Sequence, residues 1–222
     1  MPGKRQDNPY MQLRGNRRVY LYSPDPAVFD PVLMARTLSH ESRYVGNYGA
    51  YSVAQHAVNV HNVVVALLAK NVNNWGNEFT PYVQLAVRLT ALHHDDVEGV
   101  TGDVPSPVKR EAAAECWECG VESSFKVLEE GLEEAVMDRY GLSVDLLNHP
   151  IIKLADQITF CAEVLKLTPP DAHPAYEEDL GSCLDEHKQF HPGWGDILPW
   201  PAFQAMGRYL DIHDELHEEM NR

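Results

Sequence analysis

The residues best suited to chemistry lie between Ala91 and Lys109, where the sequence reads ALHHDDVEGVTGDVPSPVK. An apolar segment there runs into two histidines and two aspartates in a row, from His93 to Asp96. An unpaired carboxylate in an apolar environment is costly to bury, and a bound metal ion is the simplest compensation. The segment therefore predicts a metal site at the end of a helix.

Two other apolar segments each carry a side chain that could join this site. His56 lies on the apolar stripe of one predicted helix, and Asp156 lies in another. Taken alone, a histidine on such a stripe is more often a satisfied core residue. Together with His94 and Asp95, however, these residues form a set of two imidazoles and two carboxylates, which suits Mn, Fe, Co, Ni or Zn, with Mg as a candidate second ion. Four protein ligands leave positions open for water and a substrate oxygen, as in a hydrolytic site.

The elements that must position these residues are predicted to be helices. Ser52 and Gln55 have the capping-box spacing at the start of one of them, and the segment that leads to His94 is apolar on nearly every side, as in a central helix. Residues 1–30 indicate an arm with a short edge hairpin near Arg17, and 71–78 indicate a polar loop. Residues 168–200 are rich in Pro and Gly and predict a long irregular segment before the last helix. The predicted helices span 31–39, 52–70, 81–97, 106–140 with a break near Gly120, 151–167 and 201–219.

Composition excludes several classes of protein. The chain has 222 residues and a formal net charge of −15, which disfavours binding to the phosphate backbone of nucleic acids. It contains no apolar run of about 18 residues that would predict a membrane span. The basic N-terminus has no apolar core behind it, so we expect no secretory signal and a cytosolic location.

The order H…HD…D resembles that of the HD-domain metal-dependent phosphohydrolase superfamily. YSVAQH at 51–56 and HHDDVEGVTGDVPSPVK at 93–109 are similar to YSVAEH and HDxxExxxGDxPxPxK, the patterns of the bacterial 5′-deoxynucleotidase branch and its phage-borne relatives. The resemblance covers roughly residues 35–165. It implies an all-α fold, an HD-domain helical bundle with a metal site in its core, in which 1–30 is an arm and 31–222 a single domain.

The resemblance also implies which residues bind the metal. The ligands map onto His56, His94, Asp95 and Asp156. His93 and Asp96 compete for the same positions, but alignment of the following Glu and GD favours His94 and Asp95.

Further roles follow from matching positions in the same family pattern. Glu98 matches the glutamate that positions or activates the attacking water, and helical spacing would place it on the side of His94. Asp103 matches the aspartate expected near the sugar or the reacting phosphate.

Four more residues match positions that bind or support the substrate. Arg43 and Tyr44 stand where the family has an arginine and an aromatic residue that contact phosphate and deoxyribose, although the best-known members have Trp instead of Tyr. Lys109 could contact a phosphate or lie on the helix surface. Glu163 matches a glutamate near the site and shares one face of its helix with Asp156.

The function implied is hydrolysis of a 2′-deoxynucleotide, a small-molecule substrate whose charge the cation would offset. Our first expectation is a purine substrate, with dATP giving deoxyadenosine and triphosphate, or dAMP giving deoxyadenosine and phosphate. One alternative is a 5′-deoxynucleotidase of broad specificity, and another is a nucleotide-binding regulator with a slow site. We expect no membrane partner and a homo-oligomer.

Several other residues with metal-binding side chains are interpreted as structural. His61 lies near His56 but in a weaker pattern. The spacing Cys116-x-x-Cys119 stands alone in a Glu-rich helix and only weakly suggests a zinc or redox site. The C-terminal region carries four more histidines, His187, His191, His213 and His217, of which the i,i+4 pair His213 and His217 is predicted to be solvated on an acidic helix.

Overall fold

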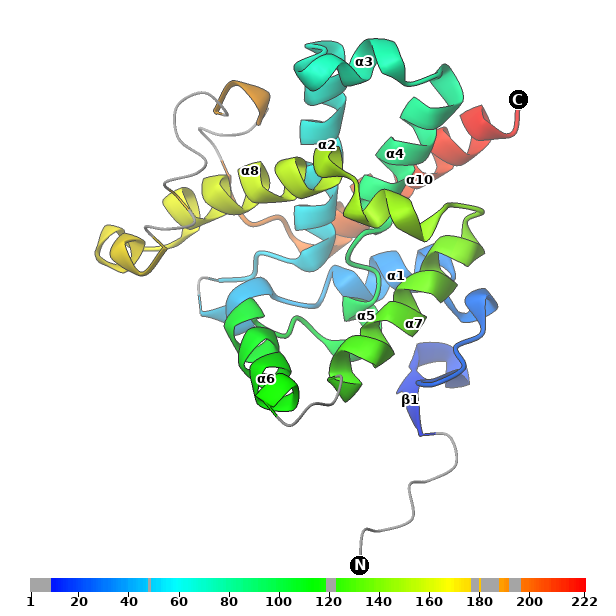
Figure 1. The fold of residues 1–222 in the computed structure, drawn as a ribbon, viewed down its shortest axis with the longest axis vertical. Coiled ribbons are helices and arrows are strands. Elements are labelled where there is room, and N and C mark those ends of the chain that lie inside the picture. Colours follow the sequence, from blue (N-terminus) through cyan, green and yellow to red (C-terminus); the bar gives the residue numbers. More distant parts are fainter. Residues whose placement is uncertain (1–8, 48, 119–122, 177–179, 181–187, 192–196) are drawn as a thin grey trace, which may run out of the picture.

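Helix α2 (Val53–Ala69) stands at the centre of the molecule. In a computed structural model, which describes residues 9–47, 49–118, 123–176, 180, 188–191 and 197–222, it contacts α4 (Pro81–His93), α8 (Pro150–Leu167) and α10 (Ala202–Met220) (Figure 1). The part of the chain described contains one small two-stranded sheet and is otherwise helical where it is regular. The predicted all-α class is confirmed.

Local sequence explains where the central helices begin. The Ser52 hydroxyl accepts a hydrogen bond from the Gln55 amide at 3.2 Å, and so caps α2. Thr80 caps α4 in the same way at 3.3 Å, and Pro81 occupies the first turn, where no backbone donor is needed. Most side chains of α2 are buried, in keeping with a helix that is apolar on nearly every side.

The helix predicted for 81–97 ends earlier than expected, at His93. The chain makes turns through 94–97, and a short helix, α5 (Glu98–Thr101), follows. The buried Asp96 side chain is 2.8 Å from Nδ1 of His93, and its backbone N–H bonds the His93 carbonyl at 3.2 Å, a turn rather than a helical pattern. The helical spacing that was used to place Glu98 beside His94 is therefore wrong, because the two residues do not share one helix.

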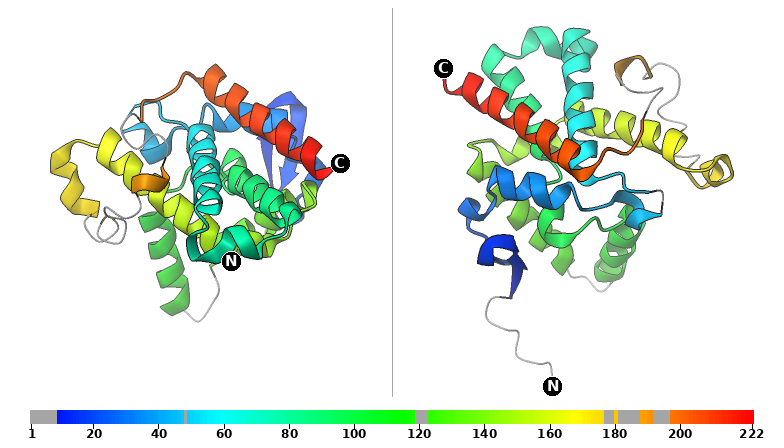
Figure 2. Two further views of the ribbon diagram at one scale, coloured as in Figure 1. Left: turned by 90° about the horizontal axis from the view of Figure 1, so that it is seen from above. Right: turned by 180° about the vertical axis from the view of Figure 1, so that it is seen from behind.

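Two apolar clusters surround the inner ends of these helices. One joins α1 (Pro31–Leu38), α7 (Ser124–Arg139), α10 and the first half of α2. The other joins the second half of α2 with α4, α8 and α3 (Trp75–Glu78). Seen from behind in Figure 2, α10 runs diagonally across α1, α2 and α4, which it contacts. The predicted metal ligands lie near the start of α2 (His56), just after the end of α4 (His94 and Asp95) and within α8 (Asp156).

The predicted edge hairpin near Arg17 is confirmed. Strands β1 (Tyr10–Leu13) and β2 (Arg17–Tyr20) pair antiparallel, with Tyr10 opposite Tyr20. Val19 is fully buried in the first apolar cluster, so the hairpin rests on the helical body. The division of the chain at residue 30 stays a prediction.

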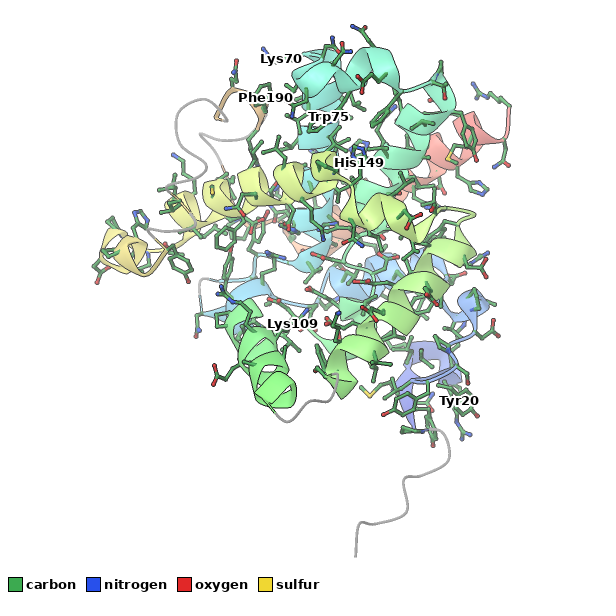
Figure 3. The ribbon with its side chains drawn as sticks, viewed as in Figure 1. Tyr20, Lys70, Trp75, Lys109, His149 and Phe190 are labelled. Atoms are coloured by element: carbon green, nitrogen blue, oxygen red, sulfur yellow. The ribbon has the colours of Figure 1, made fainter. Side chains whose placement is uncertain are left out.

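The segment 71–78, predicted as a polar loop, contains helical turns. Its Trp75 is buried, and the centroid of its ring lies 6.0 Å from that of His149. Both residues are labelled in Figure 3. Burial of this indole against the end of α2 orders a segment whose polar composition predicts a loop. The expectation was wrong for α3.

The region predicted as one broken helix forms two helices, α6 (Ser106–Glu118) and α7. Gly120 and Cys119 lie outside the described residues, so neither the break itself nor the Cys116-x-x-Cys119 spacing can be placed. The long segment before α10 contains two short 3-10 turns among its described residues. The short 3-10 elements are Arg14–Asn16, Pro26–Val28, Arg43–Gly46, Val72–Asn74, Val144–Asn148, Pro170–Tyr176 and Lys188–Phe190. No helix within the described ranges is long and apolar enough to cross a membrane.

Candidate active site and metal centre

His56 is fully buried where α2 contacts α8. Its Nδ1 atom lies 2.6 Å from Oε1 of Glu163. An ionised carboxylate can only accept a hydrogen bond, so His56 donates through Nδ1. In the neutral ring the lone pair then resides on Nε2, as in a histidine that binds a metal through Nε2.

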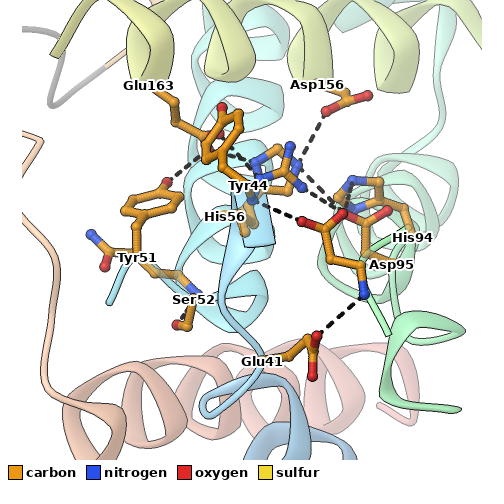
Figure 4. A network of polar contacts seen from close by, with 12 residues as sticks. Glu41, Tyr44, Tyr51, Ser52, His56, His94, Asp95, Asp156 and Glu163 are labelled. Atoms are coloured by element: carbon orange, nitrogen blue, oxygen red, sulfur yellow. Dashed lines mark hydrogen bonds and ion pairs between the residues drawn. The ribbon is translucent and has the colours of Figure 1, made fainter. Parts of the chain in front are cut away.

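The end of α4 brings a second histidine to the same place. Nδ1 of His94 donates to the carbonyl of Ala91 at 2.9 Å, which again leaves Nε2 as the free nitrogen. This Nε2 lies 3.3 Å from Oδ2 of Asp95, and the same Oδ2 lies 3.5 Å from Nε2 of His56. The ligand atoms of His56, His94 and Asp95 all lie within 4.8 Å of one another (Figure 4).

Asp156 approaches this group from α8. Its Oδ1 atom is 3.1 Å from Nε2 of His56. Burial favours the neutral acid, but His56, His94 and Arg43 outweigh it and hold the pKa of Asp156 well below its ordinary value. In turn, burial and the Arg43 charge lower the pKa of His56, whereas Glu163 and Asp156 raise it to about 10. The carboxylates thus favour a positive charge at Nε2, which either a proton or a metal ion can supply.

The donor set fits a divalent metal ion. Nε2 of His56 and Nε2 of His94 are both buried and have no hydrogen-bond partner among the residues described. Buried polar atoms without partners are rare in proteins, and such an atom calls for a partner such as a bound ion. Two imidazole nitrogens with carboxylate oxygens are ligands that suit first-row transition metals.

Glu163 contacts His56 and several side chains beside the candidate metal ligands. Its side chain is fully buried and accepts hydrogen bonds from the hydroxyls of Tyr44 and Tyr51, each at 2.8 Å. It also lies 3.2 Å from Nε of Arg43. Burial favours protonation, but His56 and Arg43 lower the pKa of Glu163 to about 2. Glu163 is therefore an ionised acid that orients neighbouring side chains.

Tyr51 is a residue that the sequence reasoning missed. Its hydroxyl accepts a hydrogen bond from Asn59 at 2.8 Å while it donates to Glu163. The signal was present, because Tyr51 is the first letter of the YSVAQH segment. A buried tyrosine needs a partner for its hydroxyl, and a carboxylate near the ligands is one.

Glu98 lies at the start of α5, close enough to Asp95 for their charges to interact. Burial first, and then the charge of Asp95, raise the pKa of Glu98 well above its ordinary value. Its Oε2 atom is buried without a hydrogen-bond partner in the described part of the chain. The arrangement suits a carboxyl group that keeps its proton at a higher pH than an ordinary glutamate does.

Asp103 fixes the loop that carries the predicted substrate contacts. The backbone N–H of Tyr44 donates to Oδ2 of Asp103 at 3.0 Å. Tyr44 and Val45 have left-handed backbones, with φ of 58° and 55°. This conformation is unfavourable for a β-branched residue and persists only where surrounding contacts hold it. Asp103 and Glu163 are two of these contacts.

A cleft of about 520 Å³ opens beside the cluster. The residues that line it include Arg43, Tyr44, Asp103 and Asp156, whereas Glu163 is not one of its lining residues. For Lys109 a phosphate contact and a place on the helix surface were both open. Its Nζ atom lies 2.7 Å from Oε1 of Glu129, between α6 and α7 (Figure 3).

The competing residues of the HD segment face the opposite way. His93 and Asp96 are fully buried, and Nε2 of His93 lies 2.9 Å from Nδ1 of His213 on α10. The prediction that His213 is solvated was wrong, because α10 turns this residue into the bundle while His217 stays exposed. The tertiary partner on α4 decides this, and no local pattern on α10 shows it.

Two other buried histidines, His191 and His61, are not among the candidate metal ligands. His191 is buried, and burial lowers its pKa to about 4. Burial lowers the pKa of His61 to about 4 as well, and its Nδ1 lies 3.3 Å from Asn62. His187 lies outside the described residues.

Comparison with known proteins agrees with this geometry. Among curated protein sequences, none matches the chain closely enough to indicate common ancestry. A family model described as 5′-deoxynucleotidase YfbR-like matches residues 43–169, which is more than half of the chain and includes every candidate residue from Arg43 to Glu163. The chain therefore belongs to the YfbR-like 5′-deoxynucleotidase family, a branch of the HD-domain phosphohydrolases.

Proposed function

We propose that the protein is a metal-dependent phosphohydrolase that releases a 2′-deoxynucleoside from its 5′-phosphate ester. One observation carries the proposal: the unpartnered Nε2 atoms of His56 and His94 converge with Asp95, next to a cleft of nucleotide size. Family membership supports the same reaction class.

We propose that His56, His94, Asp95 and Asp156 hold the metal ion. Asp156 both approaches His56 and lines the cleft, so the site borders on the space for the substrate. When bound, a divalent metal ion polarises a phosphoryl oxygen and makes water more acidic.

The remaining groups have roles that follow from their positions. Arg43 lines the cleft and offsets the charge of the phosphate, because guanidinium groups bind phosphate oxygens through several donors. Glu98 accepts the proton of the attacking water as the new bond to phosphorus forms and the bond to the 5′-oxygen breaks. The leaving alkoxide takes up a proton from solvent and Glu98 returns its proton to solvent, so that a deoxynucleoside and inorganic phosphate result. Asp103 holds the Tyr44 loop in place at the cleft wall.

The substrate that we place first is a 2′-deoxynucleoside 5′-monophosphate, with dAMP as the best representative. A second candidate is a deoxynucleoside triphosphate such as dATP, from which triphosphate would be released. The observation that favours it is Arg110, an exposed cation that lines the cleft in addition to the buried Arg43. A longer phosphate chain could reach both cations.

The test is to load the protein with Mn, Co, Zn or Mg in turn and to offer a panel of deoxynucleoside mono- and triphosphates with their ribonucleotide counterparts. Release of phosphate from the monophosphates supports the proposal, and release of tripolyphosphate supports the second candidate. If no product appears with any metal while nucleotide still binds, the chain is a binding protein and the enzyme proposal fails.

A further inference from the structure

The cleft extends beyond its charged end. Asp156, Gln157 and Phe160 all line it and follow one another along α8. Phe160 is one helical turn further along than Asp156, a rise of about 6 Å. In Figure 1 this end of α8, with the segment Pro170–Tyr176 that follows it, projects past α2 above α6. The cleft therefore runs from an acidic end at Asp156 toward an aromatic end at Phe160.

Two aromatic rings form the wall at that end. Phe160 and Tyr176 lie with their ring centroids 6.0 Å apart and their planes at 65°, an edge-to-face pair. Both side chains are half-buried, and both line the cleft. Half-buried rings in a concave site present an apolar face to whatever occupies it.

The third aromatic residue of the cleft is already engaged. Tyr44 donates its hydroxyl to Glu163 at 2.8 Å, and the guanidinium of Arg43 lies 5.6 Å from the centroid of its ring. One edge and one face of this ring are therefore in use within the protein. Phe160 and Tyr176 supply the rest of the aromatic surface in the cleft lining.

We propose that Phe160 and Tyr176 form the subsite for the nucleobase, and that this subsite favours a purine. The inference rests on the proposed function for the position of the phosphate, at Arg43 and Asp156. Bases stack on aromatic side chains, and the larger ring system of a purine buries more surface on such a wall. One helical turn separates the two ends of the site, which is on the scale of the separation between phosphate and base in a nucleotide.

Gln157 gives the subsite a polar group. It lines the cleft between Asp156 and Phe160, and its amide carries both a donor and an acceptor. Its Nε2 atom already donates to Sγ of Cys161 at 3.7 Å. Gln157 therefore adds polarity beside the aromatic wall, and the preference for a purine rests on the two rings alone.

Tyr176 lies outside the part of the chain that the family model matches. The family match ends at residue 169, so the wall is completed by a residue outside the matched region. Preference for a base is then a property of the 170–176 segment as well as of the shared helices.

The experiment compares a substrate that has a base with one that lacks it. The metal-loaded protein and its Phe160→Ala variant are assayed on dAMP and on 2-deoxyribose 5-phosphate. We expect kcat/KM for dAMP to fall about tenfold, which is the scale of stacking one base on one ring, and kcat/KM for the sugar phosphate to stay unchanged. Tyr176→Ala should act in the same direction, and Phe160→Tyr should restore activity on dAMP.

The matched control is Phe203→Ala, because Phe203 is 79% exposed on α10 and is not part of the cleft lining. This control should leave both substrates unaffected. An equal fall for dAMP and the sugar phosphate in Phe160→Ala would overturn the subsite, since it would show a general loss of structure. The same conclusion follows if Phe203→Ala reproduces the selective effect.

Binding of deoxyadenosine separates this inference from the proposed function, because the nucleoside has no phosphate to hydrolyse. Calorimetric titration should show that Phe160→Ala weakens its binding about tenfold and that Phe203→Ala does not. If the wild-type protein hydrolyses neither ester, the proposed function fails, and this titration still decides the subsite. Absence of binding to the wild-type protein, or equal binding to Phe160→Ala, overturns the subsite.

Discussion

Nδ1 of His56 and Oε1 of Glu163 lie 2.6 Å apart, and both side chains are fully buried. Glu163 also lies 3.2 Å from Nε of Arg43. One acid thus orients a proposed metal ligand and the cation proposed to bind the phosphate. Its role is to position these residues, because Glu163 does not line the cleft.

Glu163→Gln should weaken metal binding about 10- to 100-fold, the range for loss of a group that orients a metal ligand. The amide keeps the shape of the side chain but removes the charge that raises the basicity of His56. Metal titration by calorimetry, followed by kcat of the metal-saturated variant, measures the effect.

The control for this change is Glu215→Gln on α10, whose side chain is 62% exposed beside Arg88. It should leave the metal affinity unaltered. If Glu163→Gln bound metal as the wild type does and only lost turnover, Glu163 would act through Arg43 or Tyr44 and not through His56.

Substitutions of the two adjacent aspartates, Asp95 and Asp96, should differ in their effects on metal binding and on stability. Asp95→Asn should abolish metal retention after dialysis and reduce turnover to background, because it removes a charged ligand. Asp96→Asn should keep the metal but lower stability by about 1–3 kcal/mol, since its buried carboxylate accepts hydrogen bonds from Tyr209 and His93. Metal content and the denaturant midpoint of each variant are the measurements. If Asp96→Asn lost the metal and Asp95→Asn kept it, the ligand pair would be His93 and Asp96.

Much of the fold follows from local sequence. Caps at Ser52 and Thr80 and the apolar composition of the segments after them predict α2 and α4. That His56, His94 and Asp95 lie together could be predicted for a similar reason, because a charged residue within an apolar helix needs a partner, and the family pattern names the partners. Their role as metal ligands stays a prediction. The end of α4 could not, since a tertiary contact of Asp96 with Tyr209 competes with the helix there.

The sequence does not show which way a side chain turns when its partner is distant in the chain. His213 appears as one of two histidines on an acidic helix, but Nδ1 of His213 lies 2.9 Å from Nε2 of His93, a residue of another helix. Lys109 and Arg110 pose the same problem. Only the packing of α6 on α7 decides that Lys109 meets Glu129 and that Arg110 lines the cleft.

Substitutions of Lys109 and Arg110 form a matched pair that tests whether the substrate is a deoxynucleoside triphosphate. Arg110→Ala should raise KM for a deoxynucleoside triphosphate about fivefold, in line with loss of one exposed ionic contact, and should affect the monophosphate less. Lys109→Ala should leave both KM values unchanged and lower the denaturant midpoint slightly, because it removes the contact with Glu129. If Lys109→Ala raised KM instead, the phosphate chain would have to reach Lys109 at the contact between α6 and α7.

Glu98→Gln tests the proposed base. It should lower kcat about 10²- to 10⁴-fold, the contribution of a positioned general base, while the variant retains its metal. Burial and the Asp95 charge raise the pKa of Glu98, so the wild-type protein should lose activity, as pH falls, at a higher pH than an ordinary glutamate would give. This acid limb of kcat/KM should be absent from Glu98→Gln. Glu134→Gln, an exposed acid on α7, is the control and should keep the wild-type profile. An unchanged acid limb in Glu98→Gln would assign the ionisation to another group and leave Glu98 only the task of orienting water.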